Sequence, residues 1–290
     1  MSYTREIQNK ITSIQNIRKI TRAMKLIATN KMLKSQHCME SARLYTDYAR
    51  NIITNVLQVT TKYHHAYFQN HNITSVGIVV ISTDRGLCGG LNINLFKKVL
   101  KEIKAFQSNK VKIDLYLVGL KAEKFFKGIS GVNIVSMINL HHSGQIYNLV
   151  TRVVNIMIEA FCHRNIDLLK VFSNKFVNTI KNIPLGIQLL PILTPQIPAN
   201  SVITKNWDYI YEPGMLGVLN LLLKRYIESQ VYLAVMENIA CEQVSRMLAM
   251  KNATDNADNM LNKLNLEYNK VRQDFITKEL AEIVSGTTKV

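Results

Sequence analysis

The sequence predicts an α/β fold in which long N- and C-terminal helices form an antiparallel coiled coil and a Rossmann-like α/β domain is inserted between them. The first 76 residues contain neither glycine nor proline, and after Gly217 the only such residue is Gly286. Glycine and proline are the main helix breakers, so two long uninterrupted helices are expected. The predicted parts are an N-terminal helix over 1–60, an α/β domain over 74–205 and a C-terminal helix over 210–286.

Apolar residues in the C-terminal helix recur at alternating spacings of three and four. This pattern is typical of a coiled coil, and its strict seven-residue period predicts a left-handed supercoil. The two sets of positions, here called the seams, are Leu219, Tyr226, Leu233, Ala240, Met247, Thr254, Leu261, Tyr268 and Phe275, and Leu222, Ser229, Met236, Gln243, Met250, Ala257, Leu264 and Val271.

The N-terminal helix carries a matching apolar stripe. A very long helix needs a partner helix to bury one face along its whole length, and within one chain the two end helices are the economical pair. An intermolecular coiled coil is the alternative. The stripe consists of Ile7, Ile11, Ile14, Ile17, Ile20, Met24 and Ile27, followed less regularly by Met32, Leu44, Ile53 and Leu57.

The middle of the chain alternates short β-branched runs with amphipathic segments. A β-α-β-α-β-α order implies a mostly parallel sheet with helices on its faces. We expect strands over 75–82, 112–118 and 132–140, helices over 91–106, 120–126 and 144–163, and late strands or a hairpin over 168–174, 176–180 and 187–190.

The composition points to a folded protein with an acidic partner. Apolar residues make up 47% of the chain and charged residues 19%, while the formal net charge is +16. Nucleic acid, an anionic membrane surface or an acidic protein would fit this charge, and a solvated lysine-rich surface is the plain alternative. The chain has no apolar run of about 18 residues and no secretory or transit pattern, so we expect a cytoplasmic-side or already processed protein.

One segment has the look of a catalytic loop, residues 82–92 with the sequence STDRGLCGGLN. It follows a predicted strand and opens a helix, where phosphate-binding loops occur, but it matches neither dinucleotide-binding nor P-loop spacing. Cys88 has no histidine or acidic partner nearby in the sequence, and the four cysteines are too far apart for a zinc site. We therefore expect no catalytic residue, cofactor or metal, with turn formation by the glycines as the role of this loop.

Four motifs resemble the gamma subunit of bacterial F-type ATP synthase. They are the opening ITSIQNIRKITRAMKLIATNKM, the loop TDRGLCGGLN, the stretch ENIACEQVSRMLAMKNATDNA and the end YNKVRQDFITKELAEIVSG, over residues 11–32, 83–92, 237–257 and 268–286. Both ends and the middle match in the right order. In two places the sequence departs from the family. Asp258 stands where small residues are more usual, and Gly214-Met215 stands where the family sequence is more acidic or contains proline.

The resemblance implies a rotor subunit without a catalytic site of its own. Its paired helices would insert into the hexameric ring of alpha and beta subunits, and its α/β domain would lie near the epsilon subunit and the membrane c-subunit ring. Proton flow would turn it, ATP would be made on the beta subunits, and the protein would be peripheral on the cytoplasmic side of the inner membrane. No nucleic acid, small-molecule substrate or cofactor is implied.

The resemblance also places partner contacts on individual residues. Met24 belongs to the part of the N-terminal helix that faces the ring, and Gln243 and Arg246 match positions that meet an acidic loop of a catalytic subunit. The remaining matches are Arg272, Gln273 and Thr277 at the upper bearing, and Tyr209 and Glu212 at the foot near the membrane rotor and epsilon.

Two other readings stay open from the sequence. A nucleic-acid-binding coiled-coil protein would show salt-sensitive binding to DNA or RNA. A nucleotide-binding α/β enzyme that uses the loop over 82–92 would bind nucleotide saturably as an isolated chain.

Overall fold

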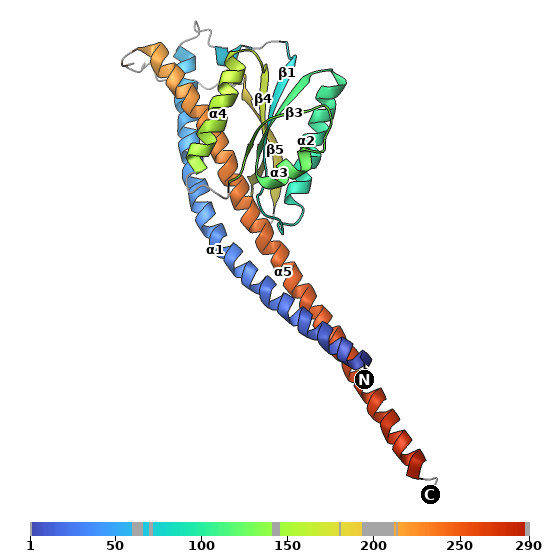
Figure 1. Cartoon of the computed structure of the whole chain (residues 1–290). Coiled ribbons are helices and arrows are strands. Elements are labelled where there is room, and N and C mark those ends of the chain that lie inside the picture. The colour runs from blue at the N-terminus through green and yellow to red at the C-terminus, as the bar shows by residue number, and fades with distance from the viewer. Residues whose placement is uncertain are drawn as a thin grey trace, which may run out of the picture. The chain divides into compact units, whose positions relative to one another are not determined.

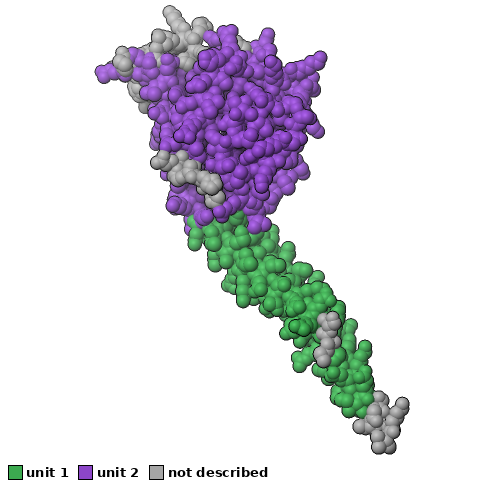
Figure 2. All heavy atoms as spheres, viewed as in Figure 1, with its two compact units in different colours: residues 1–30, 246–290 green, residues 31–245 purple. Residues whose placement is uncertain are grey.

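The computed structural model describes residues 2–59, 66–69, 72–140, 146–179, 181–192, 212 and 214–287. Its long terminal helices are α1 (Ser2–Val59) and α5 (Met215–Thr287), so the two predicted end helices are confirmed. Contacts divide the chain into two compact units, residues 31–245 and residues 1–30 with 246–290 (Figure 2).

The larger unit contains a five-stranded sheet with the order β3-β2-β1-β4-β5. All neighbouring strands run parallel except β4 and β5, so the predicted mostly parallel sheet is confirmed. The remaining elements are a short 3-10 helix (Ala66–Phe68), β1 (Ser75–Ile81), α2 (Leu91–Ser108), β2 (Lys112–Val118), α3 (Leu120–Phe126), β3 (Asn133–Ile138), α4 (Ile146–Cys162), β4 (Leu168–Phe176) and β5 (Asn182–Leu190).

The late strands form a hairpin of two strands, so the separate strand expected over 176–180 is wrong. After β4 the chain turns, and the Asn178 side chain stabilises this turn because its Oδ1 accepts a hydrogen bond of 2.6 Å from the backbone N–H of Lys181. Asparagine commonly forms side-chain-to-backbone bonds of this kind in turns, which compete with strand pairing. β5 then starts earlier than expected.

Helices cover both faces of the sheet (Figure 1). Successive residues of β1 point to opposite faces, and all of them are buried. Val76, Ile78 and Val80 pack with residues of α2 and α3, whereas Val79 and Ile81 belong to a core shared with α4 and α5. Burial on both faces explains why β1 is a continuous apolar run.

Within the larger unit α5 has two buried faces. One face, with Leu223, Ile227 and Val231, joins the core of the α/β domain. The other carries the predicted seam residues Met236 and Ala240, which cluster with Met39 of α1. Of the buried α5 residues in the first face, the predicted seams include only Leu219, because the heptad pattern describes pairing with one partner helix.

In the smaller unit the α5 seams are confirmed. Every predicted seam position from Met247 to Phe275 is buried or half-buried, while most positions between them are exposed. Met250, Ala257 and Leu261 are the most deeply buried.

The apolar stripe predicted for α1 is wrong at Ile17, Ile20, Ile27 and Leu44, whereas its members Met32 and Ile53 are buried and Met24 is half-buried. Ile17, Ile20 and Ile27 are 53%, 59% and 55% exposed, and Leu44 is exposed as well, while the side chain of Leu57 lies outside the described residues. The buried and half-buried positions instead follow a strict four-three spacing through Ile7, Ile11, Ile14, Arg18, Thr21, Lys25 and Ala28, continued by Met32, Ser35, Met39, Ala42, Thr46, Ala49, Ile53 and Val56. Small and polar residues thus occupy much of the face that packs against α5.

Candidate functional site: the paired helices

Polar side chains join α1 to α5 in the smaller unit. Arg18 Nη1 donates to Asp258 Oδ1 at 3.0 Å, and Thr254 Oγ1 donates to Thr21 Oγ1 at 2.9 Å. The residue numbers rise along α1 as they fall along α5, so the helices are antiparallel. Polar contacts at specific seam positions fix the register of a coiled coil. Arg18 also gives Asp258, one of the departures from the family pattern, a structural role.

A more buried link lies in the larger unit. Arg43 Nη2 donates to Glu237 Oε1 at 2.6 Å, and the Glu237 side chain is largely removed from solvent. Close by, the buried Thr46 hydroxyl donates to the carbonyl oxygen of Ala42 at 2.8 Å and lies 3.5 Å from that of Ser229. These contacts hold the two helices in one alignment here too.

The C-terminal part of α5 continues past the first residues of α1. Tyr3, in the first turn of α1, donates its hydroxyl to Glu267 at 2.8 Å, and α5 extends a further 20 residues to Thr287. Arg272, Gln273 and Thr277 lie in this extension and are exposed. The Thr277 hydroxyl donates to the Gln273 carbonyl oxygen of the same helix at 2.8 Å.

Exposed apolar side chains accompany these polar ones, and the sequence reasoning did not select them. On the α5 extension, Ile276, Leu280, Ile283 and Val284 are exposed at helical spacing. On α1 three isoleucines of the predicted stripe, Ile17, Ile20 and Ile27, form a second exposed set. A strict heptad spacing would have identified this second set. Ile7, Ile11 and Ile14 are separated by four and then three residues, so the next buried position is 18, and Ile17 lies off this spacing.

The other predicted contact residues differ in how far they are exposed to solvent. Met24 and Arg246 are half-buried, and Gln243 is only 9% exposed, because it occupies a seam position of α5. Glu212 is exposed, and Tyr209 lies outside the described residues. Within this chain Arg272, Gln273, Thr277 and Glu212 are thus more accessible than Met24, Gln243 and Arg246. The assignment of partner contacts to all of these positions stays a prediction.

The loop over 82–92 leads from β1 into α2, and two of its side chains contact the start of α3. Ser82 Oγ accepts a hydrogen bond of 2.9 Å from the backbone N–H of Ala122, and Asp84 Oδ1 accepts one of 3.1 Å from Leu120 N–H. Gly119 has φ of 98°, and a Cβ there would lie 2.6 Å from the Ser82 carbonyl oxygen, so only glycine fits. Asp84 therefore caps the start of α3.

Helix α5 occupies the crevice at the carboxyl ends of β1 and β4, where ligands bind in open α/β sheets. Asn174 of β4 donates to Asn238 Oδ1 at 2.9 Å, and Cys241 Sγ donates to the Asn174 carbonyl oxygen at 3.4 Å. Cys241 clusters with buried Cys88, and burial raises the pKa of the Cys241 thiol to about 12. The position that a nucleotide would take is filled by the chain itself.

Comparison with known families assigns the chain to one of them. A family model described as ATP synthase matches residues 3–290. The chain belongs to the gamma-subunit family of ATP synthases. Gamma subunits form the central stalk and are not catalytic, so this chain is a rotor subunit, and catalysis lies in the beta subunits.

Solved structures share the fold of this gamma-family chain. A chain of the Euglena gracilis mitochondrial ATP synthase in rotational state 3 matches with a TM-score of 0.68 and 15% identity, covering 99% of this chain and 94% of that one. A rotor chain of the same enzyme in rotational state 1 gives 0.65 and 17%, with coverages of 95% and 99%. A central-stalk chain of the Tetrahymena thermophila enzyme gives 0.59 and 22%, with 81% and 99%.

Among the described residues, none of the helices has the length and apolar character that crossing a membrane requires. Within the same residues, no three or more His, Cys, Asp or Glu side chains group together in a way that could hold a metal ion.

Proposed function

We propose that this gamma-family chain couples proton flow through a membrane c-subunit ring to ATP synthesis on a surrounding ring of alpha and beta subunits. The observation that carries the proposal is the family match over residues 3–290, combined with an α1–α5 pair whose polar links set one register. Rotation of the pair presents a different face to each beta subunit in turn. Through the same contacts the chain regulates ATP hydrolysis and proton passage.

The mechanical load of this role favours two mutually bonded helices. If on the order of ten charges cross a membrane at about 150 mV per turn, the work is tens of kcal/mol. That exceeds the net stability of a typical domain, about 5–15 kcal/mol. The load must therefore be distributed along the helix pair, and cross-links such as Arg18–Asp258 and Arg43–Glu237 oppose sliding of one helix along the other.

The proposed contacts with the ring use both charged and apolar side chains. Arg246 and Gln243 meet an acidic loop of a beta subunit, and Met24 faces the ring from α1. Arg272, Gln273 and Thr277 sit in the upper bearing, together with the exposed apolar set on the α5 extension, which supplies apolar area for a partner to bury. A net charge of +16 suits acidic partner loops.

The foot of the chain and its location complete the proposal. Tyr209 and Glu212 contact the epsilon subunit and the c-subunit ring, and the protein is peripheral on the cytoplasmic side of the inner membrane, as in bacterial enzymes. The three-part division into 1–60, 74–205 and 210–286 describes segments with separate tasks, namely two shaft helices and a domain that binds epsilon.

The test is reconstitution with purified alpha and beta subunits. We expect the full chain to co-purify with them at modest salt and to yield a complex whose ATP hydrolysis is stopped by a covalent cross-link between this chain and a beta subunit. The isolated chain should hydrolyse no ATP. A complex that forms without this chain and hydrolyses ATP at an unchanged rate, with no effect of the cross-link, would contradict the rotor function.

A further inference from the structure

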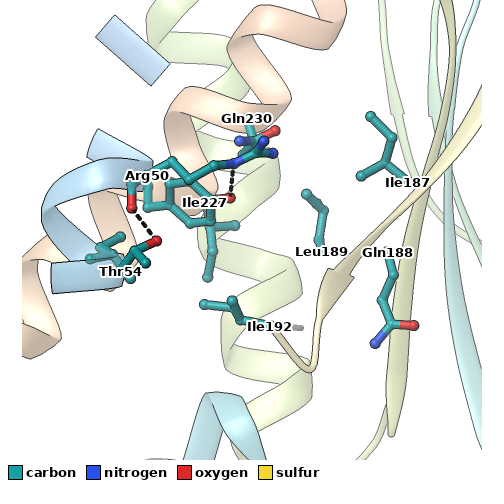
Figure 3. A pocket seen from close by; sticks show the side chains of 10 residues that line it. Arg50, Thr54, Ile187, Gln188, Leu189, Ile192, Ile227 and Gln230 are labelled. Atoms are coloured by element: carbon teal, nitrogen blue, oxygen red, sulfur yellow. Dashed lines mark hydrogen bonds between the residues drawn. The ribbon is translucent and has the colours of Figure 1, made fainter. Parts of the chain in front are cut away.

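A cavity of about 250 Å³ lies in the larger unit between α1, α5 and β5 (Figure 3). Its floor is apolar and formed by buried side chains from α1, α5 and β5 and by Ile192, the second residue after β5. Ile227 is 1% exposed, Ile53 4%, Leu189 6% and Ile192 9%. The polar groups of the lining lie around this floor and come from Arg50, Thr54, Gln188, Tyr226 and Gln230.

Among the described residues of the lining, Arg50 is the only charged one. Its Nε donates to the Tyr226 hydroxyl at 3.4 Å, the single hydrogen bond that its guanidinium makes among the described residues. No carboxylate within the described part of the chain forms an ion pair with it, and Asp47, one turn earlier on α1, exerts only a longer-range attraction. Figure 3 shows this hydrogen bond among the side chains that line the cavity, which include Gln230, one turn after Tyr226 on α5.

We propose that this cavity binds a small amphipathic monocarboxylate. The two terminal nitrogens of Arg50 form a planar fork that matches the two oxygens of a carboxylate, while the isoleucine and leucine side chains receive an alkyl tail. A volume of about 250 Å³ holds roughly eight non-hydrogen atoms at about 30 Å³ each, the size of hexanoate.

The other lining groups favour a singly charged ligand. Gln188 Nε2 already donates to the Pro191 carbonyl oxygen at 2.8 Å, and the Thr54 hydroxyl donates to the Arg50 carbonyl oxygen at 2.9 Å. A phosphate group would bring more charge than one arginine neutralises, and a cation would be repelled by it. The inference does not depend on the rotor function.

The isoleucine methyl groups allow binding to be read at the cavity itself. We would label the isoleucine δ1 methyls of the full chain with ¹³C and titrate hexanoate, 1-hexanol and acetate by NMR. Hexanoate should shift the methyls of Ile53, Ile187, Ile192 and Ile227 with a Kd of about 1 mM, and leave exposed Ile17 and Ile20 unchanged. Hexanol, which lacks the charge, and acetate, which lacks the tail, should each bind at least about tenfold more weakly.

Two variants test the role of the arginine. Arg50→Gln should weaken hexanoate binding at least about tenfold, while Arg22→Gln, at an exposed arginine of the same helix, should leave it unchanged. Gln230→Glu should weaken it similarly, because the new carboxylate competes for Arg50. The proposal is overturned if hexanol binds as tightly as hexanoate, if neither variant weakens binding, or if Ile17 and Ile20 shift together with the cavity methyls.

Discussion

Nη2 of Arg43 on α1 lies 2.6 Å from Oε1 of Glu237 on α5, and the carboxylate side chain is 10% exposed whereas the arginine is 39% exposed. Removing only the arginine leaves a nearly buried carboxylate without its cation. We expect Arg43→Met to lower the free energy of unfolding by about 1–2 kcal/mol, measured by urea denaturation, because the arginine is partly solvated and the cost is below that of a fully buried pair.

The double variant Arg43→Met with Glu237→Met separates the cost of the lone carboxylate from the value of the pair. Because two apolar side chains replace both charges, it should be within about 1 kcal/mol of the natural protein. Arg22→Met, at an exposed position, is the matched control. An Arg43→Met protein as stable as Arg22→Met would show that the pair is not important for stability.

The corrected seam of α1 predicts opposite responses at adjacent residues. Ala28 is 1% exposed, so Ala28→Leu should overpack the interface and cost about 1–3 kcal/mol. Ile27→Gln should change stability by less than about 0.5 kcal/mol, since Ile27 is exposed. Thermal unfolding followed by circular dichroism measures the stability of both variants. A larger loss of stability for Ile27→Gln than for Ala28→Leu would support the stripe predicted from the sequence.

The α5 seam is tested at Leu261, which is buried, and at its exposed neighbour Asn262. Leu261→Asp places an unpaired carboxylate in the helix interface and should cost several kcal/mol. Asn262→Asp adds the same charge in solvent and should cost little. Equal shifts of the melting temperature in the two variants would refute this register.

Acid stability should depend on Asp167, which precedes β4. Burial raises the pKa of this carboxyl, but four hydrogen bonds to its Oδ2, donated by the N–H and O–H groups of Thr74 and Ser75 at 2.7–3.2 Å, lower it by more, so the net pKa is below 3.8. A depressed folded-state pKa adds stability that is present above 3.8 and is lost as the pH falls through the folded-state value.

The corresponding variant is Asp167→Asn. At pH 7 it should lower the free energy of unfolding by about 1–2 kcal/mol, and the difference from the natural protein should shrink as the pH falls below about 4. Denaturant titrations at several pH values measure this, with the exposed Asp255→Asn as control. If the difference in unfolding free energy between Asp167→Asn and the natural protein stays constant down to pH 2, the ionised Asp167 carboxylate is not its cause.

Within the proposed rotor function, Arg246→Glu should impair coupling. The new carboxylate would repel the acidic loop of a beta subunit, and a penalty of about 1 kcal/mol corresponds to an approximately fivefold loss of ATP synthesis. Synthesis in reconstituted vesicles, normalised to the amount of assembled complex, measures the effect, and Lys251→Glu at an exposed position is the control. Full synthesis by an assembled Arg246→Glu enzyme would remove this residue from the proposed contact.

The sequence by itself determined the two long helices, the mostly parallel sheet and the α5 seam. These features follow from local causes, namely the absence of glycine and proline, the periods of apolar residues and the alternation of element types. The family also followed from the sequence, because its motifs occur in order at both ends and in the middle of the chain.

Only the tertiary structure decided which face of α1 packs against α5. Large apolar residues such as Ile17 and Ile20 point to solvent, whereas Thr21 and Ala28 are buried, and the polar pairs Arg18–Asp258 and Thr21–Thr254 cross the interface. The second buried face of α5 and the polar contacts that fill the sheet crevice also became visible only there. The physical reason is that the burial of a side chain depends on the surface that packs against it. The types of residue in a helix identify its buried face only where apolar residues follow a strict seven-residue period.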